Sequence, residues 1–449
     1  MKLPALRFFQ ISRQFRSGGL SRSLPLFSVV ALISLLLTGC ADGEGERRFA
    51  NDPLPTEDVL APPTPPAATR IVLPTQSPAV PINPAELLTN TGPATNTFVI
   101  VGSRIDAIPA DGSESTTITE LIDLTLIAHG WSANGERLAI LAADKNGAAL
   151  TVRILDKSGK TLTELPLSDN ASPIPAGYGL YRITWSPTND KILLSLGTGG
   201  LIEVSEAGAR RTILSPESAP SPRAIAWSPD GSAIAWVDAG VAGNATGLYV
   251  ASTDALPVDP VTVIRPIEGR SRQIVEIAWG TGAAGIVYAE RAPGGDLSIG
   301  GDLFAVSPSG GQPDLIATAG GVTQVGAIGS FAISPDGDSV IYSVIEPVPN
   351  GVAIRRLTLR QIKGPSSFDL PSAPGAMVED FMWTSQGAVW TVRPVDDGQD
   401  RPVVQVAIAD GSVKTLFEVP ADATPVASPN SIASPVALPP PVVTSTPTP

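Results

Sequence analysis

The hydrophobic residues of the central part of the chain fall in short runs separated by turn-forming residues. One unit shows this clearly, with apolar runs at Ala224–Trp227, Ala233–Val237, Gly247–Val250 and Val261–Ile264. The first two runs are joined by Pro229-Asp230-Gly231, in which Pro fixes φ, Asp can bond the backbone and Gly accepts a positive φ. The pattern predicts four antiparallel β-strands.

This unit recurs along the chain. Its marker is a Trp, or once an Ile, followed by a turn sequence, and the six markers are Trp131, Trp185, Trp227, Trp279, Ile333 and Trp383. Successive markers are 54, 42, 52, 54 and 50 residues apart. A period near 50 residues with strand-rich units is typical of propeller blades. A single blade cannot bury both faces, so we expect the blades to stack around an axis, with each Trp as a wedge between neighbours.

An additional group of strands precedes the first marker. Phe98–Val101, Arg104–Ile108 and Thr116–Leu121 resemble strands two to four of a further blade that is short of its inner strand. The sequence therefore predicts an all-β fold, a β-propeller of four-stranded antiparallel blades, with seven blades favoured. The alternative is six blades, in which the early strands complete or cover the last blade.

The repeat resembles a known family. The motif Trp227-Ser228-Pro229-Asp230-Gly231, with a later Leu248-Tyr249-Val250, is similar to the TolB-type, WD-like propeller repeat. Weaker third-strand copies lie at 105–108, 303–306 and 404–407. The resemblance covers roughly residues 97–419 and implies the propeller fold. TolB itself has an α/β domain before its propeller, whereas a Pro-rich segment occupies that place here.

The amino-terminal segment has the features of an export signal. Residues 1–39 contain five basic residues and no acidic one, and the apolar run Leu24–Leu37 has 14 residues. A membrane-spanning helix needs about 20, so the run is typical of a signal peptide. It ends in Leu37-Thr38-Gly39-Cys40, which resembles the lipobox of bacterial lipoproteins. The resemblance implies cleavage before Cys40 and attachment of lipid to its thiol; the alternative is a chance Cys that follows an uncleaved anchor.

Two Pro-rich segments flank the predicted propeller. Residues 41–96 contain eleven prolines and residues 420–449 contain nine. Such segments cannot bury enough apolar surface to pack, so we expect both to be disordered. The predicted organisation is a signal peptide at 1–39, a lipid-anchored tether at 40–96, the propeller at 97–419 and a tail at 420–449.

The charge excludes some partners. The net charge is −13, and without residues 1–39 the chain has 25 basic and 43 acidic residues. An acidic surface repels phosphate backbones, so nucleic acid is excluded as a partner, and so is lipid headgroup binding through a basic patch. The single Cys rules out an internal disulfide. We expect a monomer that contacts the membrane only through the lipid on Cys40.

A search for catalytic motifs finds little. His129 is the only histidine and has no second His or Cys as a partner, so we interpret it as structural or incidental. Gly269–Gln273 only approaches a nucleophile elbow, because Gln occupies the last position. The Asp-Gly pairs at 336–337 and 397–398 are read as ordinary turns rather than calcium loops. The sequence predicts no enzyme, no metal and no cofactor.

Two groups of residues are candidate ligand contacts. Arg265, Arg270 and Arg272 form a basic group in an acidic protein, with a solvated loop as the alternative. Tyr178 and Tyr181 could present an aromatic surface, with core or edge packing as the alternative. By analogy with other propellers, we expect a membrane-tethered, extracytoplasmic, non-enzymatic module that binds or scaffolds a protein, peptide or glycan. The alternatives are a carbohydrate-active enzyme with carboxylates at the propeller rim, or a subunit of an envelope sensor or export complex.

Overall fold

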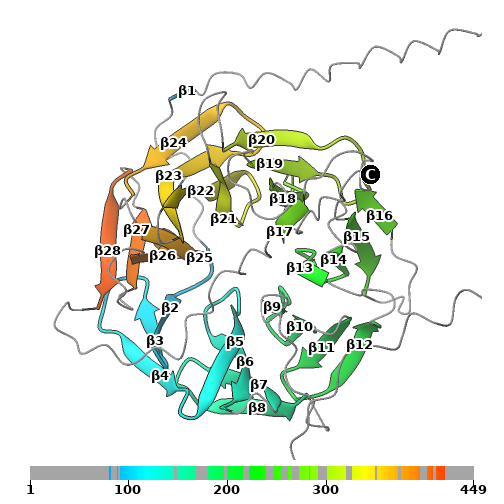
Figure 1. Cartoon of the computed structure of the whole chain (residues 1–449), viewed down its shortest axis with the longest axis vertical. Helices are drawn as coiled ribbons and strands as arrows, with labels where there is room; N and C mark the ends of the chain where they lie inside the picture. The colour runs from blue at the N-terminus through cyan, green and yellow to red at the C-terminus, as the bar shows by residue number, and fades with distance from the viewer. Residues whose placement is uncertain are drawn as a thin grey trace, which may run out of the picture. The chain divides into compact units, whose positions relative to one another are not determined.

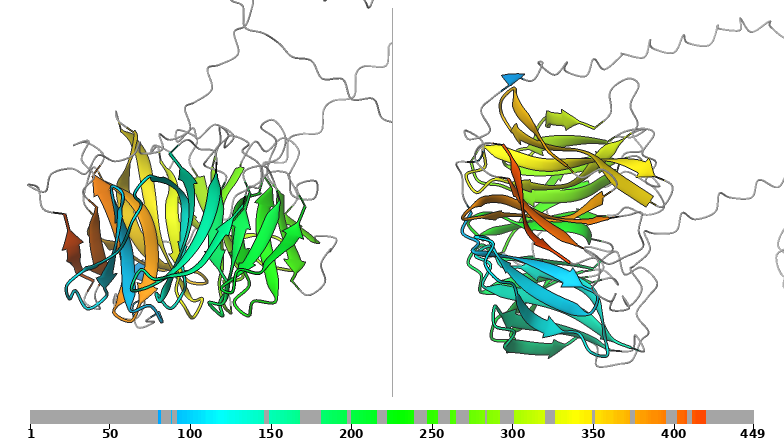
Figure 2. Two further views of the ribbon diagram at one scale, coloured as in Figure 1. Left: turned by 90° about the horizontal axis from the view of Figure 1, so that it is seen from below. Right: turned by 90° about the vertical axis from the view of Figure 1, so that its left-hand side faces the viewer.

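The structure is a computed structural model of the chain. It describes residues 80–81, 88, 92–145, 149–167, 181–196, 200–215, 222–238, 247–253, 261–264, 273–282, 284–291, 301–319, 326–348, 351–372, 376–394, 402–407 and 411–419. Within these ranges the strands form seven sheets arranged as blades around a central axis (Figure 1). Seen from the side, the strands run between the two faces of the ring (Figure 2). No helix in the described part of the chain is both long and apolar enough to cross a membrane.

The blades are numbered in chain order, and within each blade the strands follow one another from the centre outward. Blade 1 consists of β2 (Asn96–Val101), β3 (Arg104–Pro109) and β4 (Thr116–Glu120). Blade 2 consists of β5 (Leu124–Trp131), β6 (Arg137–Asp144), β7 (Leu150–Asp156) and β8 (Thr161–Pro166). Blade 3 consists of β9 (Arg182–Trp185), β10 (Lys191–Ser195), β11 (Leu201–Ser205) and β12 (Arg210–Leu214).

The remaining four blades have the same order of strands. Blade 4 consists of β13 (Pro222–Trp227), β14 (Ala233–Asp238), β15 (Gly247–Ser252) and β16 (Val261–Ile264). Blade 5 consists of β17 (Gln273–Trp279), β18 (Ile286–Arg291), β19 (Gly301–Val306) and β20 (Asp314–Thr318). Blade 6 consists of β21 (Ala327–Ile333), β22 (Ser339–Val348), β23 (Gly351–Gln361) and β24 (Ser366–Leu370). Blade 7 consists of β25 (Ala376–Thr384), β26 (Gly387–Pro394), β27 (Val403–Ala407) and β28 (Val413–Glu418).

The predicted all-β, seven-bladed propeller is confirmed. Strands β2 to β4 form a sheet of their own, so the six-bladed alternative is wrong. As the sequence predicts, the described part of blade 1 begins at the second-strand position and contains three strands.

The sequence predicts an unpacked tether over residues 40–96, but the described parts of that segment pack on the propeller. Strand β1 (Val80–Pro81) pairs in parallel with β24, at the outer edge of blade 6. Leu88 is buried in the hydrophobic cluster between blades 6 and 7. Ala94 forms a parallel bridge with Thr384 at the end of β25. Edge strands and blade interfaces offer unpaired backbone groups and apolar surface, which even a Pro-rich segment can use.

The repeated turn is held by its Ser. In blade 4 the Ser228 hydroxyl donates to the carboxylate of Asp230 (2.6 Å) and accepts the N–H of Ala233 (2.9 Å). Gly231 follows with a φ of 72°, where glycine carries no steric cost. Hydrogen bonds from Ser228 and Ser232 lower the pKa of Asp230 to about 2. The same Ser-centred bonds recur at Ser132 and Ser334, so the sequence motif encodes the turn directly.

The repeated Trp side chains lie between blades, as predicted. Trp185 packs against the core of blade 2, and its indole N–H donates to the Gly130 carbonyl (2.8 Å). Trp227 packs against the core of blade 3, and its indole N–H donates to the Thr184 carbonyl (3.4 Å). In both cases the acceptor precedes the Trp of the preceding blade. Each indole therefore adds a directional bond to the apolar contact between two inner strands.

Blades 7 and 1 meet in a different way. Their apolar contact is made by Val99, Val101 and Ile108 of blade 1 and Val389, Val404 and Val406 of blade 7. The chain before β2 adds two backbone bonds, from Gly92 N–H to the Thr384 carbonyl and from Ser385 N–H to the Ala94 carbonyl (both 2.9 Å). A Cβ at Gly92 would lie 2.0 Å from the Trp383 carbonyl oxygen, so only glycine fits there.

Replacing Ser228 by Ala should destabilise the propeller by about 1–3 kcal/mol, because the buried turn loses both hydrogen bonds of the hydroxyl. Urea denaturation followed by tryptophan fluorescence measures this. Ser385→Ala is the matched control, because Ser385 is exposed in the equivalent turn of blade 7. Equal midpoints for the two variants would contradict the role assigned to Ser228.

Candidate functional site

One position of the inner strands, three residues before the Trp or its equivalent, is charged in blades 3, 5 and 7. The position holds Ala128, Arg182, Ala224, Glu276, Ser330 and Asp380 in blades 2 to 7. In β5, β13, β17 and β25 a β-bulge lies directly before this residue. A bulge bends the strand and changes the direction of the side chain that follows. The repeat therefore gathers Arg182, Glu276 and Asp380 near the axis from three separate blades.

Glu276 is enclosed and lies within the electrostatic reach of two arginines. Burial raises its pKa to about 7, although the charges of Arg291 and Arg182 oppose the rise. Burial also lowers the pKa of each arginine, and Glu276 opposes that change. Arg291 donates through Nε and Nη2 to the Ile328 carbonyl (2.9 and 2.7 Å), so its guanidinium is fixed. The positive charges of Arg182 and Arg291 thus favour the ionised form of the Glu276 carboxyl.

Asp380 has a different environment. Its side chain is exposed to solvent. The protein atoms around the carboxyl nevertheless displace part of its hydration, and this desolvation raises its pKa. The charge of His129 opposes the rise, and so does the Phe381 N–H, which donates to the Asp380 carboxylate (2.8 Å). Among the groups that act on this pKa there is no Lys or Arg.

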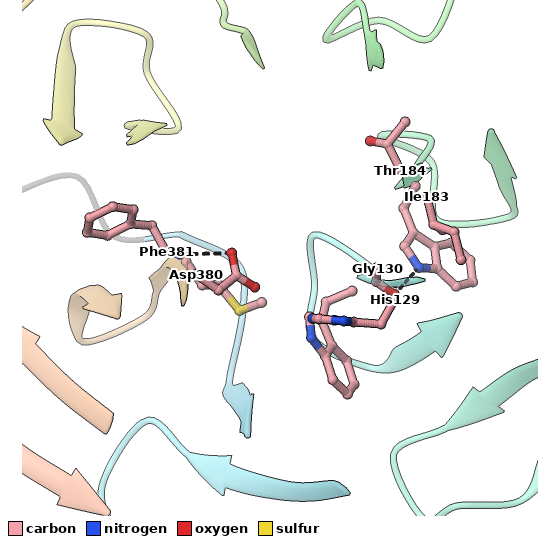
Figure 3. Close-up of a pocket in the computed structure, with 9 residues that line it drawn as sticks. His129, Gly130, Ile183, Thr184, Asp380 and Phe381 are labelled. Atoms are coloured by element: carbon pink, nitrogen blue, oxygen red, sulfur yellow. Dashed lines mark hydrogen bonds between the residues drawn. The ribbon is translucent and has the colours of Figure 1, made fainter. Parts of the chain in front are cut away.

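A pocket of about 240 Å³ contains His129 and Asp380. It is lined by three successive residues from each of three inner strands, 129–131 of β5, 183–185 of β9 and 380–382 of β25. Figure 3 shows Asp380 on one side of this pocket and His129 on the other. The lining is mixed, with one carboxyl, one imidazole and several aromatic or apolar side chains.

The pocket lies where blade 1 meets its neighbours. Met382 of blade 7 and Trp131 of blade 2 both pack against the cluster around Phe98 of blade 1. The rings of Phe98 and Trp131 stack with centroids 3.2 Å apart. Since the described part of blade 1 begins at the second-strand position, side chains of blades 7 and 2 reach across the place of an inner strand. The pocket therefore lies between the inner strands of blades 7, 2 and 3, next to the described strands of blade 1.

The structure describes only one of the site residues expected from the sequence, Tyr181. Cys40, Tyr178, Arg265, Arg270 and Arg272 are all outside the described residues. Tyr181 is described: it is 3% exposed and packs in the cluster between blades 2 and 3.

His129, which the sequence analysis interprets as structural or incidental, lines the pocket. Sequence reasoning missed Asp380, Glu276 and Arg182. The signal was present, because aligning the repeats on Trp places all three in one column, three positions earlier. Charged residues in short inner strands that are otherwise apolar would have marked that column. Among the residues that the structure describes, no three His, Cys, Asp or Glu side chains are grouped so as to hold a metal ion.

Comparison with known proteins shows similarity in fold. No family model and no curated protein matches the chain. Solved structures with a similar fold include a prolyl endopeptidase, with a TM-score of 0.51 and 10% identity over 76% of this chain and 52% of that one. An oligogalacturonate lyase in complex with manganese has a TM-score of 0.50 and 12% identity over 72% of this chain and 85% of that one. This chain thus spans about half of the prolyl endopeptidase, and such low identities show the fold alone.

These comparisons correct one prediction. The sequence analysis predicts that the protein is not an enzyme, and this is contradicted, because the propellers similar to it include those of a peptidase and a lyase. The prediction rested on the absence of short catalytic motifs. A propeller can assemble charged groups from separate blades, as Arg182, Glu276 and Asp380 show, so a missing motif does not exclude chemistry.

Replacing Glu276 by Gln should change how stability depends on pH. The pKa of Glu276 rises from 4.5 to about 7 on folding, so between these values the unfolded chain loses a proton that the folded protein keeps. Stability should therefore fall as pH rises through this window, and Glu276→Gln should remove that part of the fall. Urea midpoints at several pH values measure it, with exposed Glu114→Gln as control. An unchanged slope in Glu276→Gln would contradict the burial of this carboxyl.

Proposed function

We propose that this protein is a lipid-anchored propeller of the bacterial cell envelope that binds a cationic protein or peptide segment in the pocket between Asp380 and His129. The observation that supports the proposal most is the position of Asp380. Its carboxyl faces a pocket, its pKa is raised by enclosure, and no Lys or Arg is among the groups that act on that pKa. An opposite charge brought by a ligand would favour the ionised carboxylate.

The charge of the whole chain supports the same class of ligand. At a net charge of −13, long-range attraction favours a positively charged partner and accelerates its encounter. Glu276 offsets part of the positive charge of Arg182 and Arg291. Trp131 and Met382 add apolar contact surface to the same pocket. Such a combination of one charge and apolar walls suits a side chain with a long aliphatic stem and a cationic end.

The proposed location rests on the amino-terminal segment. The basic start, the apolar run and Cys40 together resemble the leader of a bacterial lipoprotein. Lipid on Cys40, with the Pro-rich residues that follow, would hold the propeller outside the cytoplasm and close to a membrane. A ligand in that compartment is a segment of an envelope or secreted protein.

Asp380→Asn should weaken the binding of a cationic peptide by about tenfold to hundredfold, the effect expected for losing a charged hydrogen bond. Isothermal titration of the full chain in detergent with a synthetic peptide of alternating lysine and valine measures it. In the wild type the affinity should also fall as pH drops through the raised pKa of Asp380.

Asp314→Asn is the matched control, because it changes the net charge equally but lies exposed on the outer strand β20. An equal loss of peptide affinity in both variants would show that only net charge matters, and it would contradict binding in the pocket. Absence of any binding to the wild type would overturn the proposed function.

Cys40→Ala should yield a protein that carries no lipid. Metabolic labelling with radioactive palmitate, followed by fractionation of cells, measures both lipid attachment and membrane association. The variant should lose the label, while the fold of the propeller stays intact by circular dichroism. Label that survives the substitution would contradict the anchor.

A further inference from the structure

We propose that the chain just before β2 is a latch that holds two walls of the Asp380 pocket together and thereby controls the affinity of the pocket. The latch consists of residues 92–96, which lead into blade 1. This inference rests on the proposed function, because it concerns the regulation of the same pocket. It follows from the contacts that the latch makes with blade 7 on one side and blade 2 on the other.

The comparison begins with the inner turns, which join the first and second strands of a complete blade. Neighbouring inner turns contact each other directly. The Thr281 hydroxyl of blade 5 donates to the Pro335 carbonyl of blade 6 (3.0 Å). A Cβ at Gly231 of blade 4 would lie 3.7 Å from Cδ of Pro187 in blade 3. These contacts connect successive blades at one end of their inner strands.

The latch takes the place of this turn in blade 1. The described part of blade 1 begins at the second-strand position and so contains no inner turn. Toward blade 7, the Gly92 N–H donates to the Thr384 carbonyl, and the Ser385 N–H donates to the Ala94 carbonyl (both 2.9 Å). Toward blade 2, a Cβ at Gly135 would lie 3.5 Å from Cβ of Ala94. Ala94 is completely buried, so the latch bridges the inner turns of blades 7 and 2.

The same two blades supply facing walls of the pocket. Strand β25 contributes Asp380–Met382, and the latch binds two residues further along, at Thr384. Strand β5 contributes His129–Trp131, and the turn that contains Gly135 follows directly. Figure 3 shows the side chains of these two strands on opposite sides of the pocket. The position of the latch is therefore transmitted to both walls.

Few interactions hold the chain that leads to the latch. Among the described residues, Leu88 packs in the cluster that contains Phe381 and Trp383 of β25. Further upstream, β1 pairs with β24 through two residues. Segments with few buried contacts open at a lower free-energy cost than the core of a fold. The latch can therefore open while the blades stay folded, and Leu88 ties this opening to a residue of the pocket wall.

Gly92→Ala should release the latch, because the added Cβ would lie 2.0 Å from the Trp383 carbonyl oxygen. It should weaken binding of the lysine–valine peptide by about tenfold, within the usual range for coupled sites. Gly280→Ala is the matched control, since its Cβ would lie 2.7 Å from Cβ of Ala284 and would crowd a different blade interface. Isothermal titration of the full chain in detergent should give the control the wild-type affinity. Equal losses in both variants would assign the effect to crowding and overturn the latch.

Hydrogen exchange of the wild-type chain tests the coupling without a substitution, so it decides the matter even if Gly92→Ala does not fold. Opening of the latch breaks the bond from the Ser385 N–H to the Ala94 carbonyl, so exchange of this amide reports the open state. Coupling is reciprocal, and a peptide that prefers the closed latch must also stabilise it. Saturating lysine–valine peptide should slow exchange of the Ser385 amide by about tenfold and leave the Gly231 amide of blade 4 unchanged. Exchange of Ser385 that does not respond to the peptide would overturn the inference.

The remaining outcomes separate the inference from the function on which it rests. If Ser385 exchanges faster in Gly92→Ala, but this variant binds the peptide as tightly as the wild type, the latch does not control the pocket and the proposed function stands. If Ser385 exchanges at the same rate in both chains, residue 92 does not hold the latch and the inference fails alone. If the peptide binds neither chain, both fail.

Discussion

The indole wedge between neighbouring blades is the interaction on which the rest of the structure depends. A four-stranded sheet exposes two apolar faces, and burying both requires a blade on each side. Trp185 and Trp227 fill the space between inner strands and also donate to a carbonyl of the preceding blade. The bond fixes the relative position of two strands that apolar contact alone would allow to slide. Between blades 6 and 7 the equivalent Trp383 packs in the apolar cluster without this bond, because its Nε1 has no hydrogen-bond partner among the described residues.

The first blade shows what happens where this interaction is incomplete. Trp131 meets blade 1 at a sheet whose described part begins one strand further out, and its ring stacks on Phe98. Closure of the ring is then carried by apolar contacts with blade 7 and by backbone bonds around Gly92. A pocket with Asp380 on one wall lies between the inner strands of blades 7, 2 and 3. The candidate site is therefore next to the blade that departs from the repeat in the described part of the chain.

Charge near the axis follows from the same repeat. Residues three positions before the Trp come close together because every inner strand places that position near the axis. Enclosure by the surrounding blades raises the pKa of both Glu276 and Asp380. The two carboxyls differ in their neighbours, since Glu276 lies near two arginines and Asp380 near His129. That difference, rather than burial alone, makes Asp380 the carboxyl suited to a ligand.

The sequence by itself determined the blades, because their strands, turns and wedges are encoded locally. The Ser, Asp and Gly of the turn at 228–231 bond one another within a few residues, so the motif alone predicts the geometry. The sequence also determined the presence of blade 1, through the apolar runs before Trp131. The tertiary structure alone decided which residues meet: Asp380 and His129 are about 250 residues apart and face each other only because the ring closes. Proximity and enclosure across blades depend on long-range packing, and no local pattern records them.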